Sequence, residues 1–210
     1  MFDITMDTQR VFRNLLESIS YPGRKINIYS DENYGVELFD TTIEVALTLL
    51  DGEVTFFIEG NLKKSEEEIF IRTNSKVSNR EDADFIIIPL REKIDFKNYL
   101  DEENNPLIKV GSLIDPQYSA TFIVEVEKLN EGDELEITGP GIENSKSISG
   151  IGTKEILDLR DKLCDFPIGV DIFFIDREKN VMAIPRSTKI KGWLDGICSS
   201  TRWTGGYKRI

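Results

Sequence analysis

The sequence predicts an α/β domain of three layers, in which helices cover the two faces of a mixed β-sheet. In the first half of the chain, segments with helical periodicity alternate with short apolar runs that are typical of strands. In the second half, apolar runs follow one another across polar turns, which favours antiparallel neighbours. Interleaved elements followed by hairpins are typical of a sheet that has both parallel and antiparallel strands.

Four segments are predicted to be helices because apolar residues recur in them every three or four positions. The first helix should end at Pro22 and Gly23, which cannot continue it. The second has capping-box spacing at Thr41 and Glu44 and an expected C-cap at Gly52. The helices are expected over 8–20, 40–52, 62–74 and 153–163, and the third of them should be mostly exposed.

Short apolar runs predict the strands. The run over 82–90 has a continuous apolar centre, as expected of a strand buried on both faces. The runs over 119–129 and 133–141 are expected to be adjacent strands. Val170–Ile175 and Val181–Ile184 flank a polar turn and predict a hairpin. Further strands are expected over 25–29 and 54–60, and one short helix and a loop over 91–106.

A single domain is predicted over 1–190, followed by a C-terminal extension over 191–210. The chain has 210 residues, enough for one sizeable domain, and no internal repeat or low-complexity linker divides it. The extension is rich in glycine and contains both tryptophans. Two interpretations of it stay open: an arm that packs on a partner, and a partly ordered terminus.

The formal net charge of −12 argues against a nucleic-acid-binding surface, because phosphate backbones are bound by clustered Lys and Arg. A local basic pocket for small anions is still compatible with this charge. No apolar run approaches the roughly 20 residues that cross a bilayer, and the first residues lack the features of a secretory signal. We therefore expect a cytoplasmic protein without membrane or nucleic-acid partners.

The chain contains no histidine, which excludes Ser-His and Cys-His catalytic pairs and the commonest zinc ligand. Cys164 and Cys198 form no CxxC motif and are interpreted as ordinary thiols. We expect no metal site. Any acid–base chemistry would require Asp, Glu, Lys, Tyr or Cys.

Three short motifs are candidates for binding an anion. In "PRST", Arg186 could clamp a phosphate or phosphonate while Ser187 and Thr188 donate hydroxyl hydrogen bonds; the alternative is an arginine that pairs with an acid across a subunit interface. In "TGPGIE", Gly139 and Gly141 would allow close backbone approach, or form a plain turn. "SYPGRKI" is either a helix stop or a loop that brings amides and an arginine towards a ligand.

Asp171 lies in an apolar strand two residues after Gly169. A buried carboxylate must be paired or neutral, so Arg186 or Arg13 is expected as its partner. A structural ion pair is favoured over a catalytic acid, because structural networks also bury carboxylates.

Taken together, ordered stretches of the chain resemble the H subunit of the bacterial carbon–phosphorus lyase system, which degrades phosphonates. The resemblance extends from about Thr8 to Ile190, and the extension after Lys191 departs from the family pattern. The stretches that carry it are "FRNLLESISYPGRKI" (12–26), "TTIEVALTLLD" (41–51), "GSLIDPQYSATFIVEV" (111–126), "ITGPGIE" (137–143) and "FPIGVDIFFID…MAIPRST" (166–188).

The resemblance implies a fold similar to that of pyridoxal-phosphate-dependent aminotransferases, without that cofactor. It implies a homodimer that assembles with the G, I and J subunits and acts with the G, I and L subunits in an early step. In that step an alkylphosphonate displaces adenine from ATP, giving ribose 1-alkylphosphonate 5-triphosphate; the J subunit, a radical SAM enzyme, later breaks the carbon–phosphorus bond. ATP and alkylphosphonate are then expected as ligands shared with the other subunits.

No nucleophile–base pair is recognisable, so no catalytic residue is assigned and an accessory subunit, inactive alone, is expected. It would be structural or contribute part of a binding surface. The residues of the candidate anion or interface cluster are Arg13, Ser20, Pro22, Gly23, Gly139, Gly141, Asp171, Arg186, Ser187 and Thr188.

Two other functions stay open. The first is an independent enzyme of the aminotransferase-like fold, which would need a Schiff-base lysine and an acid for the pyridine nitrogen; Asp171 could be that acid, but Lys189 and Lys191 have no convincing partner. The second is a nucleotide-binding regulatory module that uses the "TGPG" and "PRST" motifs.

Overall fold

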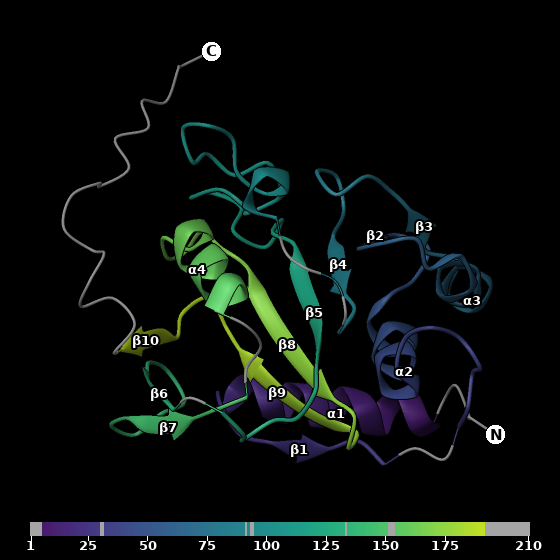
Figure 1. The fold of residues 1–210 in the computed structure, drawn as a ribbon, viewed down its shortest axis with the longest axis horizontal. Helices are drawn as coiled ribbons and strands as arrows, with labels where there is room; N and C mark the ends of the chain where they lie inside the picture. The colour runs from purple at the N-terminus through teal and green to yellow at the C-terminus, as the bar shows by residue number, and fades with distance from the viewer. Residues whose placement is uncertain are drawn as a thin grey trace.

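The computed structural model describes residues 6–29, 32–90, 92, 95–132, 134–150 and 154–191. A seven-stranded sheet has the order β1-β9-β8-β5-β4-β2-β3, and a smaller sheet has the order β10-β6-β7 (Figure 1). The strands are β1 (Ile26–Asn27), β2 (Thr55–Ile58), β3 (Lys76–Val77), β4 (Phe85–Ile88), β5 (Thr121–Val126), β6 (Leu135–Thr138), β7 (Lys146–Ile148), β8 (Asp171–Asp176), β9 (Asn180–Ile184) and β10 (Lys189–Lys191).

The large sheet is mixed, as the sequence predicts. β3, β2, β4, β5 and β8 run parallel to one another, and β9 and then β1 add antiparallel strands at one edge. Ile86, Ile87 and Ile88 of β4 are all buried, which confirms a strand covered on both faces. The predicted hairpin is also confirmed, since Ile175 of β8 pairs with Val181 of β9.

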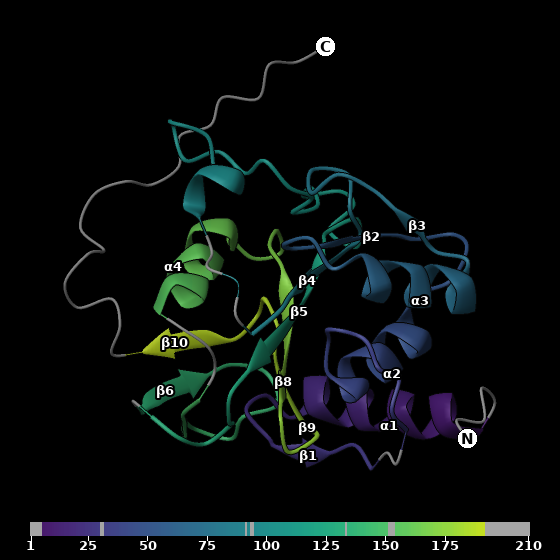
Figure 2. The same cartoon turned by 45° about the vertical axis from the view of Figure 1, so that its right-hand side comes forward.

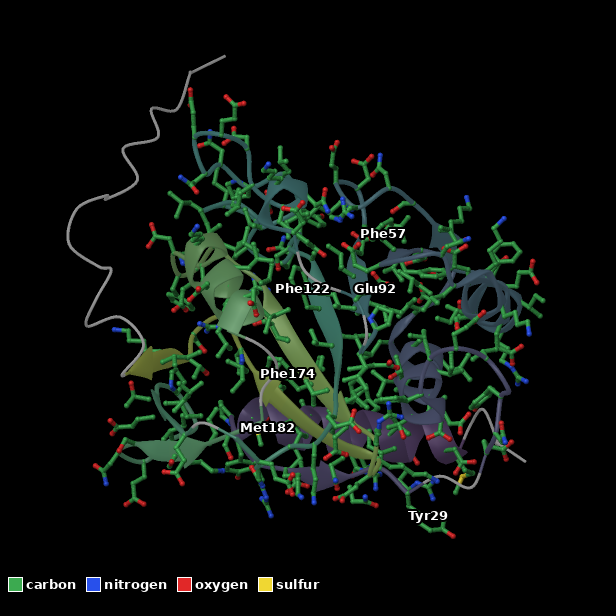
Figure 3. All side chains as sticks on the ribbon, in the orientation of Figure 1. Tyr29, Phe57, Glu92, Phe122, Phe174 and Met182 are labelled. Carbon is green, nitrogen blue, oxygen red and sulfur yellow. The ribbon has the colours of Figure 1, made fainter. Side chains whose placement is uncertain are left out.

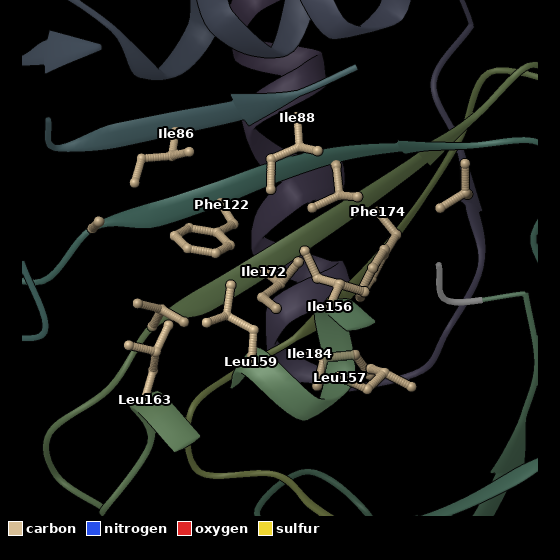
Figure 4. Packing of buried hydrophobic residues seen from close by; sticks show 14 of the residues in the cluster. Ile86, Ile88, Phe122, Ile156, Leu157, Leu159, Leu163, Ile172, Phe174 and Ile184 are labelled. Atoms are coloured by element: carbon tan, nitrogen blue, oxygen red, sulfur yellow. The ribbon is translucent and has the colours of Figure 1, made fainter. Parts of the chain in front are cut away.

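Helices cover both faces of this sheet (Figure 2). On one face, α1 (Met6–Ser20), α2 (Asp40–Leu49) and α3 (Lys63–Thr73) share an apolar core with the sheet. On the other face, α4 (Lys154–Leu163) packs with the smaller sheet. Its Ile156, Leu159 and Leu163 lie against side chains of β4, β5 and β8 (Figure 4). Phe122, Phe174 and Met182 belong to this second core (Figure 3).

The smaller sheet corrects one prediction about strand pairing. β5 and β6 are not neighbours: β5 lies between β4 and β8 in the large sheet, whereas β6 pairs with β10 and β7. The apolar pattern identified both strands but could not choose their partners, because strand pairing depends on distant residues. β10 extends to Lys191, opposite Glu136, one residue past the boundary predicted for the domain.

The predicted caps of α2 are wrong. Thr41 and Glu44 are buried inside the helix, and its C-cap is Leu50 rather than Gly52. The N-terminus is satisfied instead by the carboxylate of Glu125, which accepts hydrogen bonds from the Phe39 amide (2.7 Å) and the Thr42 hydroxyl (2.8 Å). A carboxylate from β5 thus caps the helix in place of a residue next to it in sequence, and the helix dipole favours a negative charge at this end.

The other predicted helices lie close to their expected bounds, and a short 3₁₀ helix, η1 (Phe96–Asn98), occupies the loop segment 91–106 as expected. Most residues of α3 outside Ser65 and Ile69 are exposed or half-buried, as predicted. Among the described residues, no helix is both long and apolar enough to span a bilayer.

Candidate functional site

The three glycine- and proline-containing motifs lie side by side. Gly141 has a φ of +80°, and a Cβ on it would lie 2.3 Å from the carbonyl oxygen of Ser20. Gly139 contacts the backbone of Ser187 and Thr188 in the same way. Close backbone approach therefore requires glycine at both positions, and it joins "SYPG" to "TGPG" and "TGPG" to "PRST".

A shallow pocket of about 330 Å³ opens where "SYPG" meets the loop after β6. Its charged lining residues are Arg24, Lys146 and one acid, Glu143, and Tyr21, Pro22, Gly141 and Asn144 also line it. Arg24 donates to Glu17 (2.7 Å) and stacks over the Tyr21 ring. Burial, together with the nearby Arg24 cation, lowers the pKa of Lys146. Within the described part of the chain, the Lys146 amine has no ion pair or hydrogen bond.

The "PRST" segment is a tight turn in which the Thr188 amide donates to the Pro185 carbonyl (3.0 Å). The Arg186 guanidinium binds both oxygens of Asp171, with Nη2 to Oδ2 at 2.5 Å, and its Nη1 donates to the Pro116 carbonyl at 2.7 Å. The predicted pairing of Asp171 with Arg186 is confirmed. Both groups are satisfied within the chain, so Asp171 is not available as the acid for a pyridine nitrogen.

The sequence analysis missed Arg160 of α4, which hydrogen-bonds to the backbone of the same turn. Its Nη2 donates to the carbonyls of Pro185 (2.9 Å) and Thr188 (2.6 Å), and its Nη1 pairs with Asp161 (3.0 Å). The side chain is buried. A signal was present, because Arg160 falls on the apolar face of α4 at helical spacing from Ile156 and Leu163.

The remaining predicted residues divide between this cluster and the surface. Pro22 and Gly23 are buried, Ser187 is half-buried, and the buried Thr188 hydroxyl oxygen has no partner among the described residues. Ser20 is exposed at the end of α1 and touches the cluster through its carbonyl. Arg13 is exposed on α1 and makes no ion pair in the described ranges. Of the two partners expected for Asp171, Arg186 is therefore the one that binds it.

A larger cavity of about 540 Å³, which the sequence did not predict, lies at the carboxyl ends of β4 and β5. This edge is the usual ligand site of α/β sheets. Its floor includes Glu125, whose pKa is raised by burial and lowered less by its hydrogen bonds. Its rim includes Glu127, Glu131 and Glu155 and one cation, Lys128, which is paired with Glu131 at 2.5 Å. Carboxylates outnumber this lysine, and an excess of them repels phosphate and phosphonate groups.

The described residues contain no group of three or more His, Cys, Asp or Glu side chains that could hold a metal ion. Cys164 is a free thiol whose pKa is raised by burial, which makes its reactive thiolate scarcer. Cys198 and both tryptophans of the extension lie outside the described residues.

Comparison with known proteins places these motifs in a family. A family model described as bacterial phosphonate metabolism protein (PhnH) matches residues 2–191. A putative C-P lyase subunit protein HtxG of Stutzerimonas stutzeri is 27% identical over 184 residues, covering 87% of this chain and 85% of that protein. The alpha-D-ribose 1-methylphosphonate 5-triphosphate synthase subunit PhnH of Rhizobium meliloti (strain 1021) is 29% identical over 191 residues, covering 90% of this chain and 92% of that protein.

Proposed function

We propose that this chain, which belongs to the PhnH family of bacterial phosphonate metabolism proteins, is an accessory subunit of the complex that makes ribose 1-alkylphosphonate 5-triphosphate. The observation that carries the proposal is the family match over residues 2–191, together with a relative named as a subunit of that synthase. The proposed reaction is displacement of adenine from ATP by an alkylphosphonate during phosphonate catabolism.

The role of the chain would be to bind and position anions, while other subunits supply the main chemistry. The absence of histidine supports this division, because the commonest general base is lacking. The pocket between Arg24 and Lys146 supports it as well. Burial and the Arg24 cation both disfavour the charged form of Lys146. A phosphonate or phosphate oxygen bound in this pocket would supply the missing negative charge and stabilise the ammonium group.

The proposal includes the assembly. The chain would form a homodimer in the cytoplasm and join the G, I and J subunits, with the L subunit in the ATP-dependent step. Both relatives are named as subunits, which supports a multi-subunit complex. We also propose the likeness to the aminotransferase fold, which the α/β architecture with a mixed sheet is compatible with.

The test is adenine release from ATP and methylphosphonate by purified G, I and L subunits, with and without this chain. Adenine should appear only when the chain is present. An unchanged rate without the chain would contradict the proposed function.

The pocket is tested in the same assay with Lys146→Gln. This variant should raise the KM for methylphosphonate or ATP at least about tenfold, since one charge-assisted hydrogen bond contributes roughly 1.5 kcal/mol or more. Lys63→Gln, on the exposed start of α3, is the matched control and should behave as wild type. Equal KM values for the two variants would argue against an anion at Lys146.

Calorimetry separates this proposal from the nucleotide-binding alternative. If the isolated chain binds ATP saturably at micromolar concentration, a regulatory module gains support. If ATP binds only after the other subunits are added, the accessory-subunit proposal does.

A further inference from the structure

Two loops at one edge of the large sheet carry large apolar side chains that face solvent. One loop precedes β5 and the other precedes β8, and because these strands are parallel neighbours the loops lie at the same edge (Figure 1). The exposed side chains are Leu113, Ile114, Tyr118 and Phe166, with exposures from 59% for Leu113 to 88% for Ile114. We call these four residues the loop surface. Large apolar side chains that are exposed at one edge of a soluble domain indicate an interaction site.

The loop surface is held on a fixed frame. The Gly169 amide donates to the Val110 carbonyl (2.9 Å), which ties the second loop to the base of the first. The Asp171–Arg186 pair extends the link, since Arg186 also binds the Pro116 carbonyl within the first loop. A surface fixed in this way loses little conformational entropy on binding, which favours a specific partner.

The charges around the loop surface indicate what kind of partner it fits. Residues 111–119 and 164–170 include Asp115 and Asp165 but no lysine or arginine. The neighbouring cations Lys109 and Arg186 are paired within the chain, with Asp84 (2.6 Å) and Asp171 (2.5 Å). A second copy would bring the same carboxylates to a symmetric seam, and each copy has a net charge of −12. A different protein with an apolar centre and a rim of Lys or Arg would complement both features.

We propose that the loop surface docks a different subunit of the phosphonate-processing complex, through an apolar face with a cationic rim. The proposal rests on the proposed function in its choice of partner. A homodimer would then use a different face of the molecule.

The experiment compares two double variants of the full chain for binding to the purified G and I subunits. Ile114→Ser/Phe166→Ser removes the two most accessible apolar side chains on separate loops, while Phe70→Ser/Ile71→Ser removes an exposed pair from α3 as the control. The loop variant should raise the Kd at least about tenfold, the effect of losing a central contact of about 1.4 kcal/mol. The control should stay within about twofold of wild type. Circular-dichroism melting checks that both variants fold.

Salt gives a second readout. Wild-type binding should weaken between low and physiological ionic strength, and Asp115→Asn/Asp165→Asn should reduce that dependence. Sedimentation of the chain alone gives the third. A wild-type dimer that the loop variant turns into a monomer would assign the loop surface to a second copy and overturn the proposal.

Equal Kd values for wild type and the loop variant, or no binding of wild type to these subunits, would also overturn it. The adenine-release assay decides the proposed function separately. If adenine release requires the chain but the loop variant supports it fully, the docking proposal fails while the function stands.

Discussion

Replacing Arg186 by alanine should destabilise the chain by about 3 kcal/mol. The change removes the two-pronged contact with Asp171 and the bond to the Pro116 carbonyl. Breaking a buried ion pair by removing one partner costs roughly 3–5 kcal/mol. Two features place this pair at the lower end: both side chains keep some solvent access, at 15% and 19%, and the Arg186 amide still donates to Asp171 at 2.7 Å.

The assay is reversible unfolding followed by circular dichroism. A loss of about 3 kcal/mol corresponds to a Tm lower by roughly 6–12 °C for a domain of this size. Arg24→Ala, which breaks the exposed pair with Glu17, is the control and should cost no more than about 1 kcal/mol. Because Arg186 also anchors the loop before β5, the alanine variant should additionally weaken complex assembly or adenine release.

A double-mutant cycle tests the reasoning itself. Asp171→Asn, Arg186→Ala and the double variant should show a coupling energy of about 2 kcal/mol, since each single change leaves the other group without its partner. Additive effects, or a Tm drop of less than about 2 °C in Arg186→Ala, would refute the assignment of this pair as a stabilising link.

Two further predictions concern Glu125 and Gly141. Burial raises the pKa of Glu125 in the folded chain, so the folded state binds more protons than the unfolded state and stability falls as pH rises through the folded pKa. In urea unfolding from pH 4.5 to 7.5, the free energy of unfolding of wild type should therefore fall relative to that of Glu125→Gln. A difference between the two proteins that stays constant with pH would contradict this. Gly141→Ala should lower the free energy of unfolding by about 2 kcal/mol more than Gly35→Ala does. Both glycines have positive φ, but only a Cβ on Gly141 would meet a backbone atom within 3 Å, the Ser20 carbonyl oxygen at 2.3 Å. Equal losses in urea unfolding would show that the "SYPG" loop shifts at little cost.

Periodicity predicted most of the large elements because their pattern is local. The helical spacing in α1 and the continuous apolar run of β4 are repeated over enough residues to be distinctive. β3, β7 and β10 were missed, since strands of two or three residues contain no measurable period of their own. β1 is equally short but lies within the alternating run over 25–29, which predicted it. The caps of α2 failed for another reason: the carboxylate that satisfies its N-terminus belongs to Glu125, 86 residues beyond Phe39.

The candidate site shows the same limit. The pairing of Asp171 could be predicted because a carboxylate in an apolar strand needs a partner, and Arg186 was near in sequence. The pocket lysine, Lys146, could not be found, because a strand residue with no motif around it gains meaning only when Arg24 comes close in the fold. The motifs predicted which segments form the site, but the approach of Lys146 to Arg24 in the pocket depends on the tertiary structure.

The distribution of charge separates the two edges of the parallel strands. At the carboxyl edge, where α/β sheets usually bind ligands, Glu127, Glu131 and Glu155 outnumber the single lysine of the cavity rim, Lys128, which disfavours phosphate. At the amino edge, parts of two stretches that carry the family resemblance, 111–126 and 166–188, converge: the loop before β5, the loop before β8 and the "PRST" turn are joined by Asp171 and Arg186. Under the proposed function, we therefore expect assembly at the amino edge, with the anion held beside it near Lys146 rather than in the cavity at the carboxyl edge.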